Sequence, residues 1–316
     1  MAKVTNAVAT YDVTTNREDL ADQVYRISPT DTPFMSAVPR KKATAVLHEW
    51  STDALAAVNT TNARLEGDAL SRAASTNPTR RQNYCQISSK DATVTGTQRA
   101  VNPAGIDDMM AYQMSKKSLE LRKDMEAILL GNTGQNAGNT TTARTLRSFN
   151  AWISGNGSRG ANGADSTAAT AAATDGTAGD LRTFTEDMLK DAIKDAYDDG
   201  GDPTLILVGT FNKQKFSTFT GRATAREMVS VGTVQGAASI YASDFGDLKV
   251  VTNRTQRGRD AFVIDPTKVA VAGLRMFEPQ ELGRVGDAVT RDLISEYTLQ
   301  MGHPDAHALV ADLTTS

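Results

Sequence analysis

Few residues in this sequence stand at a spacing that supports chemistry. Gly155, Gly157 and Gly160 satisfy the G-x-G-x-x-G pattern of dinucleotide-binding loops, and Asp175 lies at the downstream distance of a ribose-binding acid. The segment after Gly160, however, is rich in Ala, Thr and Asp and has no apolar helical face. A pyrophosphate would therefore find no helix N-terminus to bind. The motif predicts a flexible Gly-rich loop.

The histidines and the cysteine give no convincing metal site. His303 and His307 are spaced i, i+4, as two zinc ligands on one face of a helix would be. Pro304 and the strand pattern before it argue against a helix, so we interpret this segment as a polar turn between two strands. Cys85 is the only cysteine, which excludes an intrachain disulfide and a Cys-rich zinc site.

Patterns for nucleophiles and paired carboxylates are equally weak. The sequence contains no G-x-S-x-G elbow and no G-x-x-x-x-G-K-[ST] loop. Adjacent acids at 107–108 and 198–199 lie at the ends of helical stretches, where capping and solvation explain them. We therefore predict no catalytic, cofactor-binding or metal-binding residue, and a protein that is not an enzyme.

Composition narrows the class further. Of the 316 residues, 40% are hydrophobic and 22% are charged, as in ordinary soluble globular proteins. The net charge of -3 and the pI of about 5.7 give no overall basic field that would favour nucleic acid or an anionic membrane. Neither a signal-peptide core nor a run of about 18 apolar residues is present, so we expect a cytosol-like compartment and no membrane contact.

The N-terminal part of the chain predicts an arm followed by a long hairpin. Residues 1–43 show little periodicity apart from a short helical stretch at 17–27, which is followed by two prolines. Strand patterns follow at 44–51 and 84–97, and the segment between them is polar. We expect this hairpin to have a solvated tip.

The strongest predicted element is a helix over 105–130, which would be about 39 Å long. Its length indicates that it supports a wide structure. Seven apolar residues form one helical stripe: Ile106, Met110, Met114, Leu121, Met125, Ile128 and Leu129.

The remainder predicts a loop-rich region and a second α+β domain. From 133 to 180 the chain is dominated by Gly, Ala, Thr, Ser and Asn, with one anchored apolar segment at 146–153. A capping-box pattern at 183–186 opens an amphipathic helix. Strands are predicted at 204–208, 248–252, 261–264 and 269–272, and a last strand pair at 289–301 and 306–313. Helices and strands are segregated, which favours the α+β class.

Short motifs at both ends of the chain add a family resemblance. The segments T-Y-D-V at 10–13, R-E-D-L at 17–20, I-S-P-T-D-T-P-F at 27–34 and H-E-W at 48–50 resemble the opening of a subfamily of phage major capsid proteins. The ending at 297–307 is also similar to that group. Together with the order of elements, these motifs resemble the Hong Kong 97 type capsid fold of tailed-phage major capsid proteins.

The resemblance implies a division of the chain into named parts. These are an N-terminal arm at 1–43, an extended loop hairpin at 44–100, a long spine helix of the peripheral domain at 101–132, a Gly/Ala/Thr-rich loop region at 133–180, an axial domain at 181–285 and return strands of the peripheral domain at 286–316.

The function that the resemblance implies is that of a structural subunit. Such a major capsid protein self-assembles into pentamers and hexamers of an icosahedral head that encloses double-stranded DNA, which it touches by weak non-specific contact. Portal and decoration proteins are further partners, and we expect any scaffold to be a separate protein because the chain begins almost at the arm. The implied location is the virion capsid, after assembly in the host cytoplasm. Some relatives crosslink through a lysine in the extended loop, which is not expected here because 52–83 contains no lysine.

The tip of the hairpin and the proline-rich end of the arm supply the candidate contacts between subunits. The tip is locally basic on an acidic protein, so it could dock on an acidic neighbouring surface. The candidates are Arg64, Glu66, Asp68, Arg72, Arg80, Arg81, Pro29, Pro33 and Phe34.

Three other hypotheses stay open at the level of sequence. A nanocompartment shell protein of the same fold would hold enzyme cargo instead of DNA. An α+β enzyme with an unrecognised site would be a monomer that a ligand stabilises. A tail or head-decoration protein is the third, although the long helix argues against it.

Overall fold

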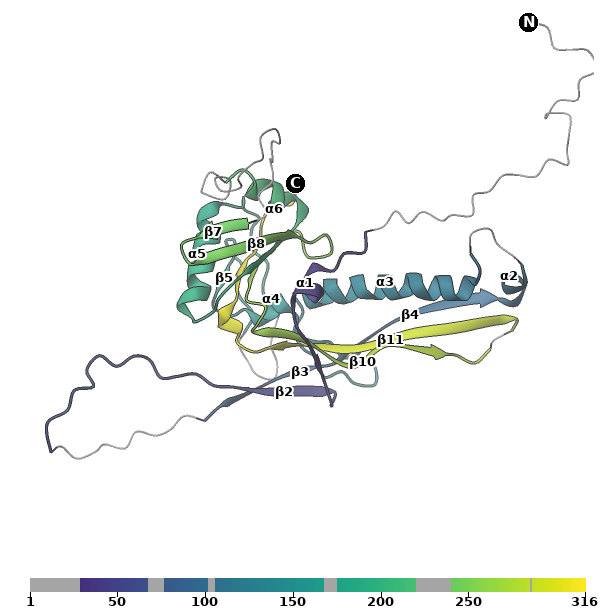
Figure 1. Ribbon diagram of the computed structural model, residues 1–316, viewed down its shortest axis with the longest axis horizontal. Coiled ribbons are helices and arrows are strands. Elements are labelled where there is room, and N and C mark those ends of the chain that lie inside the picture. Colours follow the sequence, from purple (N-terminus) through teal and green to yellow (C-terminus); the bar gives the residue numbers. More distant parts are fainter. Residues whose placement is uncertain (1–28, 68–76, 102–105, 168–174, 220–239, 285) are drawn as a thin grey trace, which may run out of the picture.

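The computed structural model describes the chain at residues 29–67, 77–101, 106–167, 175–219, 240–284 and 286–316. Figure 1 shows an elongated part, in which one long helix lies along a sheet, and a rounder part with shorter helices around a second sheet. A loop projects from the subunit away from both parts. The helix predicted at 17–27 lies outside the described residues.

The elongated part is built on a four-stranded sheet. Its strand order is β1 (Arg40–Lys42), β10 (Val269–Glu281), β11 (Ala288–Met301) and β4 (Gln86–Thr95). The pair β1–β10 is parallel and the other pairs are antiparallel. The ladder between β11 and β4 runs from Ala288 opposite Thr95 to Tyr297 opposite Gln86, which gives the sheet its length.

The long helix predicted from the apolar stripe is α3 (Met109–Leu129), which packs on β4 and β11. With 21 residues it is about 32 Å long, so the predicted helix was too long at its start. The helix begins after Asp108, which is its N-cap: the Asp108 carboxylate accepts a hydrogen bond from the Met110 N–H at 2.8 Å. The short helix α2 (Gly96–Ala100) precedes it. Among the described residues, no helix has the length and apolar character of a membrane span.

The rounder part contains a six-stranded sheet and two helices. The strand order is β5 (Gly157–Ser158), β12 (Ala308–Val310), β9 (Ala261–Ile264), β6 (Leu205–Val208), β8 (Gly246–Thr252) and β7 (Ile240–Ser243). The helices are α5 (Glu186–Asp198) and α6 (Thr210–Phe216). The predicted helix α5 is present, but the capping box expected at 183–186 is wrong: the helix begins at Glu186, and its N-cap is Thr185, whose side chain accepts a hydrogen bond from the Met188 N–H at 3.4 Å.

One hydrophobic core joins the two sheets. Leu207 and Phe262 of the six-stranded sheet belong to the same buried cluster as Leu121 of α3 and Tyr297 of β11. The apolar segment predicted at 146–153 enters this core as α4 (Phe149–Trp152), and so does α1 (Pro33–Ala37). A second cluster lies between α5 and the six-stranded sheet.

The predicted hairpin is present in part. Strand β2 (Leu47–Thr52) pairs antiparallel with β3 (Thr79–Tyr84). The Trp50 indole N–H anchors the hairpin by donating to the Met301 carbonyl at 2.8 Å. The strand pattern predicted at 84–97 does not continue the hairpin, because the chain enters β4 and pairs with β11 instead.

Two further sequence predictions were wrong. The segments 289–301 and 306–313 do not pair with each other, because the turn η2 (Pro304–Ala306) directs β12 into the six-stranded sheet between β5 and β9. The described part of the loop predicted to be flexible is packed at β5 and beyond. There the Arg159 side chain is 5% exposed and forms an ion pair with Asp165.

Candidate functional site

Two of the three glycines of the G-x-G-x-x-G motif, Gly157 and Gly160, serve close packing rather than phosphate binding, whereas Gly155 faces open space. A Cβ on Gly157 would overlap the Asp165 carboxylate, and a Cβ on Gly160 would overlap the Asp180 carbonyl oxygen. The Gly160 N–H donates to Asp312 at 3.1 Å. The space in which a pyrophosphate would lie is therefore filled by the protein's own acidic side chain and backbone.

Behind the motif lies a buried network of charged and polar side chains. Arg159 donates to Asn150 at 2.9 Å, and Asn150 donates to Asp260 at 2.8 Å. Arg257 lies 3.3 Å from the same Asp260 carboxylate. Burial raises the pKa of Asp260, and Arg257 opposes that shift. These contacts fix the loop after α4 against the turn before β9, which is a structural role.

The predicted turn at the two histidines is confirmed. His307 is buried and packs edge-on against Phe149, with 5.2 Å between ring centroids. Its Nδ1 accepts from the Asp265 N–H at 3.1 Å, and burial lowers its pKa to about 3. His303 faces Asp305 at 4.0 Å outside this core. In the part of the chain that the structure describes, no three His, Cys, Asp or Glu residues group as metal ligands would.

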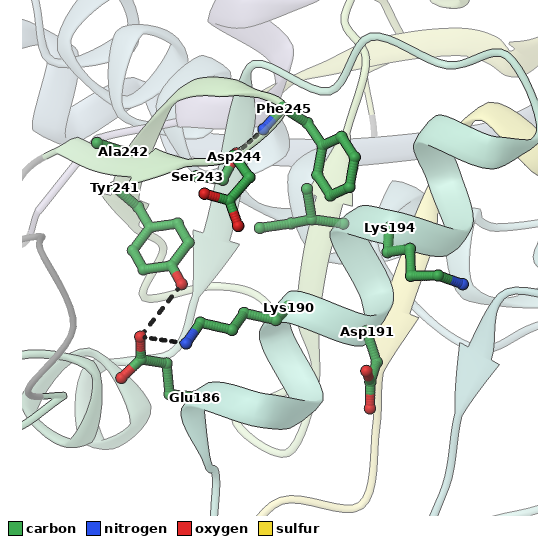
Figure 2. Close-up of a pocket in the computed structure, with 10 residues that line it drawn as sticks. Glu186, Lys190, Asp191, Lys194, Tyr241, Ala242, Ser243, Asp244 and Phe245 are labelled. Carbon is green, nitrogen blue, oxygen red and sulfur yellow. Dashed lines mark hydrogen bonds and ion pairs between the residues drawn. The ribbon is translucent and has the colours of Figure 1, made fainter.

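A cavity of about 480 Å³ lies between α5 and the β7–β8 hairpin. Figure 2 shows the Tyr241 hydroxyl and the Lys190 ammonium directed at the Glu186 carboxylate, at 3.4 and 3.1 Å. Burial and Glu186 raise the pKa of Tyr241 to about 12, so its hydroxyl stays protonated at neutral pH. The ten lining residues contain no histidine or cysteine. The Ser243 hydroxyl donates to the Gly246 carbonyl at 2.7 Å and Lys190 pairs with Glu186, so these two side chains are bonded to other groups and not to each other.

The loop between β2 and β3 exposes an unusual amount of apolar surface. Leu55, Val58 and Leu65 are 99%, 92% and 83% exposed. Soluble monomers do expose single apolar side chains, but three of them on one projecting loop indicate an interaction surface. Sequence reasoning missed these residues because it treated the loop as polar. The signal was three large aliphatic residues among Ala, Thr and Asn.

The predicted contact residues of the hairpin are only partly described. Arg64 and Glu66 are exposed on the projecting loop, while Asp68 and Arg72 lie outside the described residues. Arg80 lies 3.7 Å from Glu49 of the paired strand. The Arg81 Nε–H donates to the Thr52 hydroxyl at 3.2 Å. The two strand arginines thus have partners within the hairpin.

The predicted contact residues of the arm differ in exposure. Pro29 is exposed, and Pro33 is half-buried at the start of α1. The assignment of Phe34 to a contact between subunits is corrected: its side chain is fully buried and meets Phe149 edge-on at 5.8 Å. An aromatic side chain inside the subunit's own core has no surface left for a neighbour.

An elongated part with a long helix, a rounder part with its own sheet and a projecting loop together define the class of shell-forming proteins with the Hong Kong 97 type fold. The model of the SU10 major capsid protein family matches residues 4–314, and the chain therefore belongs to this family of phage major capsid proteins. The major capsid protein of Escherichia phage Phieco32 is 32% identical over 120 residues, which span 38% of this chain and 34% of that relative.

Solved structures share the fold at low sequence identity. A chain from Microbacterium phage Oxtober96 has a TM-score of 0.63 at 12% identity and covers 98% of this chain and 100% of its own. A structure described as phage G gp27 major capsid proteins and gp26 decoration proteins has a TM-score of 0.53 at 10% identity, with full coverage of both chains (100% and 100%). These similarities confirm the Hong Kong 97 type fold that the sequence motifs indicated.

Proposed function

We propose that the chain is the repeating subunit of an icosahedral phage head, which self-assembles into pentamers and hexamers around double-stranded DNA. The observation that carries this proposal is the exposed apolar surface of the projecting loop. Burying one such side chain contributes about 1.5–3 kcal/mol. The loop projects away from its own subunit, so this burial free energy is available only in contact with another molecule for its three exposed residues, Leu55, Val58 and Leu65.

The parts of the subunit fit the roles that a shell requires. We assign α3 as the spine helix and the four-stranded sheet as the core of the peripheral domain. The six-stranded sheet with α5 and α6 is assigned to the axial domain, and the β2–β3 hairpin with its loop is assigned as the extended loop. On this assignment β10 belongs to the peripheral domain and β12 to the axial domain, following the sheets that they join.

The remaining partners follow from the same role. The subunit acts without catalysis, is assembled in the host cytoplasm and contacts packaged DNA weakly. Scaffold and portal proteins are further partners of such a shell. A decoration protein accompanies the phage G relative, and we propose that this shell also has an outer surface on which such a protein can bind.

The test is assembly of the purified chain. Mass photometry and negative-stain electron microscopy over a range of salt and protein concentration are expected to show capsomers or closed particles. Persistence of a 33.7 kDa monomer under all conditions would overturn the proposal.

The loop itself is tested by Leu55→Asp combined with Val58→Asp. We expect particle yield to fall at least tenfold, which is about 1.4 kcal/mol, while the melting temperature of the subunit stays unchanged. Thr60→Asp combined with Asn62→Asp is the matched control, since it adds the same two charges to the exposed loop without removing large apolar side chains. Equal yields of all three proteins would show that the loop's apolar side chains are not used in assembly.

A further inference from the structure

The buried carboxylate of Glu126 holds the end of the N-terminal arm from within α3. Its Oε1 accepts a hydrogen bond from the Phe34 N–H at 2.7 Å, and its Oε2 accepts one from the Met35 N–H at 2.9 Å. These amides would ordinarily be satisfied by the residue that precedes α1, but the Thr32 side chain makes no such bond. The acceptor for these two amides is therefore a residue far away in the chain.

A third donor ties the same carboxylate to the six-stranded sheet. The Asn253 Nδ2 donates to Glu126 Oε1 at 2.8 Å, and Asn253 is itself buried directly after β8. Its Oδ1 accepts from the Thr255 N–H at 2.9 Å and from the Thr255 hydroxyl at 2.8 Å, which fixes the orientation of the amide. Glu126 thus joins the arm, α3 and the turn after β8 at one point.

This contact is made without a counter-ion. Among the described residues no Lys or Arg forms an ion pair with Glu126. Lys123 of α3, Asp31 of the arm and Arg254 of the turn line a cavity of about 160 Å³, and Glu126 is not among its lining residues. Burial raises the pKa of Glu126, while the three hydrogen bonds oppose that shift. A buried charge satisfied only by neutral donors becomes costly as soon as one donor leaves.

The position of the Glu126 contact determines which part of the chain it can orient. Figure 1 shows α1 beside the end of α3 that meets the rounder part, so the described residues before α1, 29–32, start at this junction. Phe34 and Val38 hold α1 in the common core through apolar packing, which does not by itself fix a direction. The paired hydrogen bonds to Glu126 fix the direction of α1, because the N–H groups of two successive residues must face one carboxylate.

We propose that Glu126 is the positioning residue that sets where and in which direction the N-terminal arm leaves the subunit, and that assembly depends on it. The inference rests on the proposed shell function, since the arm matters here as a contact to a neighbouring copy. The partner of the arm in this proposal is a second copy of the chain.

The test uses Glu126→Gln, which keeps the shape but places an NH₂ group where one N–H now donates. Amide hydrogen exchange of the unassembled full-length chain should become roughly tenfold faster at Phe34 and Met35, while amides of β10 and β11 keep their protection. Particle yield should fall by a similar factor. Glu120→Gln is the matched control on the same helix, because Glu120 bonds only to Lys117 at the surface, and it should leave both measurements unchanged.

A second variant separates positioning from simple helix capping. Thr32→Asp added to Glu126→Gln supplies a carboxylate from the arm itself, which should restore protection of the two amides but not the tether to α3 and Asn253. We expect particle yield to stay low. Normal yield from this double variant, or from Glu126→Gln alone, would overturn the proposal, as would unchanged exchange at Phe34 and Met35. If the parent chain never assembles, the shell function fails, and the exchange data still decide whether Glu126 holds the arm.

Discussion

Acid should destabilise this subunit through His307. The imidazole lies in the core beside Phe149, and its Nδ1 accepts a hydrogen bond from the Asp265 N–H. An accepting nitrogen carries no proton, so the folded state requires the neutral ring. Burial accordingly lowers the pKa of His307 from 6.5 to about 3.

The sign and size of the effect follow from proton linkage. Between pH 6.5 and about pH 3, the unfolded chain binds a proton at His307 that the folded chain does not. The contribution of the neutral ring to the free energy of unfolding is therefore complete above pH 6.5 and is lost as the pH falls. At about 1.36 kcal/mol for each pH unit, the loss is about 2 kcal/mol at pH 5.

The assay is urea unfolding of the dispersed subunit at pH 7 and pH 5, with His307→Asn as the comparison. Asn keeps an acceptor near the Nδ1 position but does not titrate, so it should lower stability at both pH values and remove the extra loss at pH 5. Contributions from carboxylates far from His307 are common to both proteins and cancel in the difference. His303→Asn, at the partly exposed histidine, should behave like the parent. An equal pH dependence of the parent and His307→Asn would refute this reasoning.

Two further predictions concern α3 and the glycine-rich region. Met114 lies between two apolar clusters, so Met114→Asp should cost several kcal/mol in a thermal or urea melt, whereas Lys116→Asp on the exposed side should be nearly neutral; equal melts would show that the face is misassigned. Limited trypsin digestion should cut the exposed Arg64 before Arg159, whose side chain is buried and paired with Asp165, and first cleavage at Arg159 monitored by mass spectrometry would show that this network opens.

The helix α3 could be predicted from sequence because its signal is local. Met110, Leu121, Met125 and Leu129 recur at helical spacing, and the structure buries all four. The helix start was misplaced because residues 105–108 continue the apolar and acidic pattern, and only the capping geometry of Asp108 marks the boundary.

Strand partners could not be predicted in the same way. The strand patterns of β11 and β12 are visible in sequence, but their partners β4 and β9 are distant along the chain. Pairing depends on which faces the common core buries, and that is a property of the whole fold. The same limit applies to Phe34, whose proline-rich surroundings indicated an exposed arm although its partner Phe149 lies in the core.

The contact of Glu126 was invisible to sequence reasoning for a related reason. A glutamate on a charged helix is ordinarily solvated, and nothing nearby in sequence marks this one as buried. Its donors are 92, 91 and 127 positions away, at Phe34, Met35 and Asn253. The exposed apolar residues of the loop were missed because a polar segment was assumed to carry no apolar surface.

The distribution of apolar side chains explains how a subunit can be rigid in one region and adaptable in others. A single buried cluster includes residues from both sheets, so the elongated and rounder parts cannot separate without exposing Leu207, Phe262 and Tyr297 together. The projecting loop carries apolar side chains that no described part of its own subunit covers. In the proposed shell, the loop is therefore the described part of the subunit best able to adapt to differences between pentamers and hexamers. Glu126 lies where the buried core meets the arm, so its hydrogen bonds to Phe34 and Met35 fix the point at which the arm joins that core.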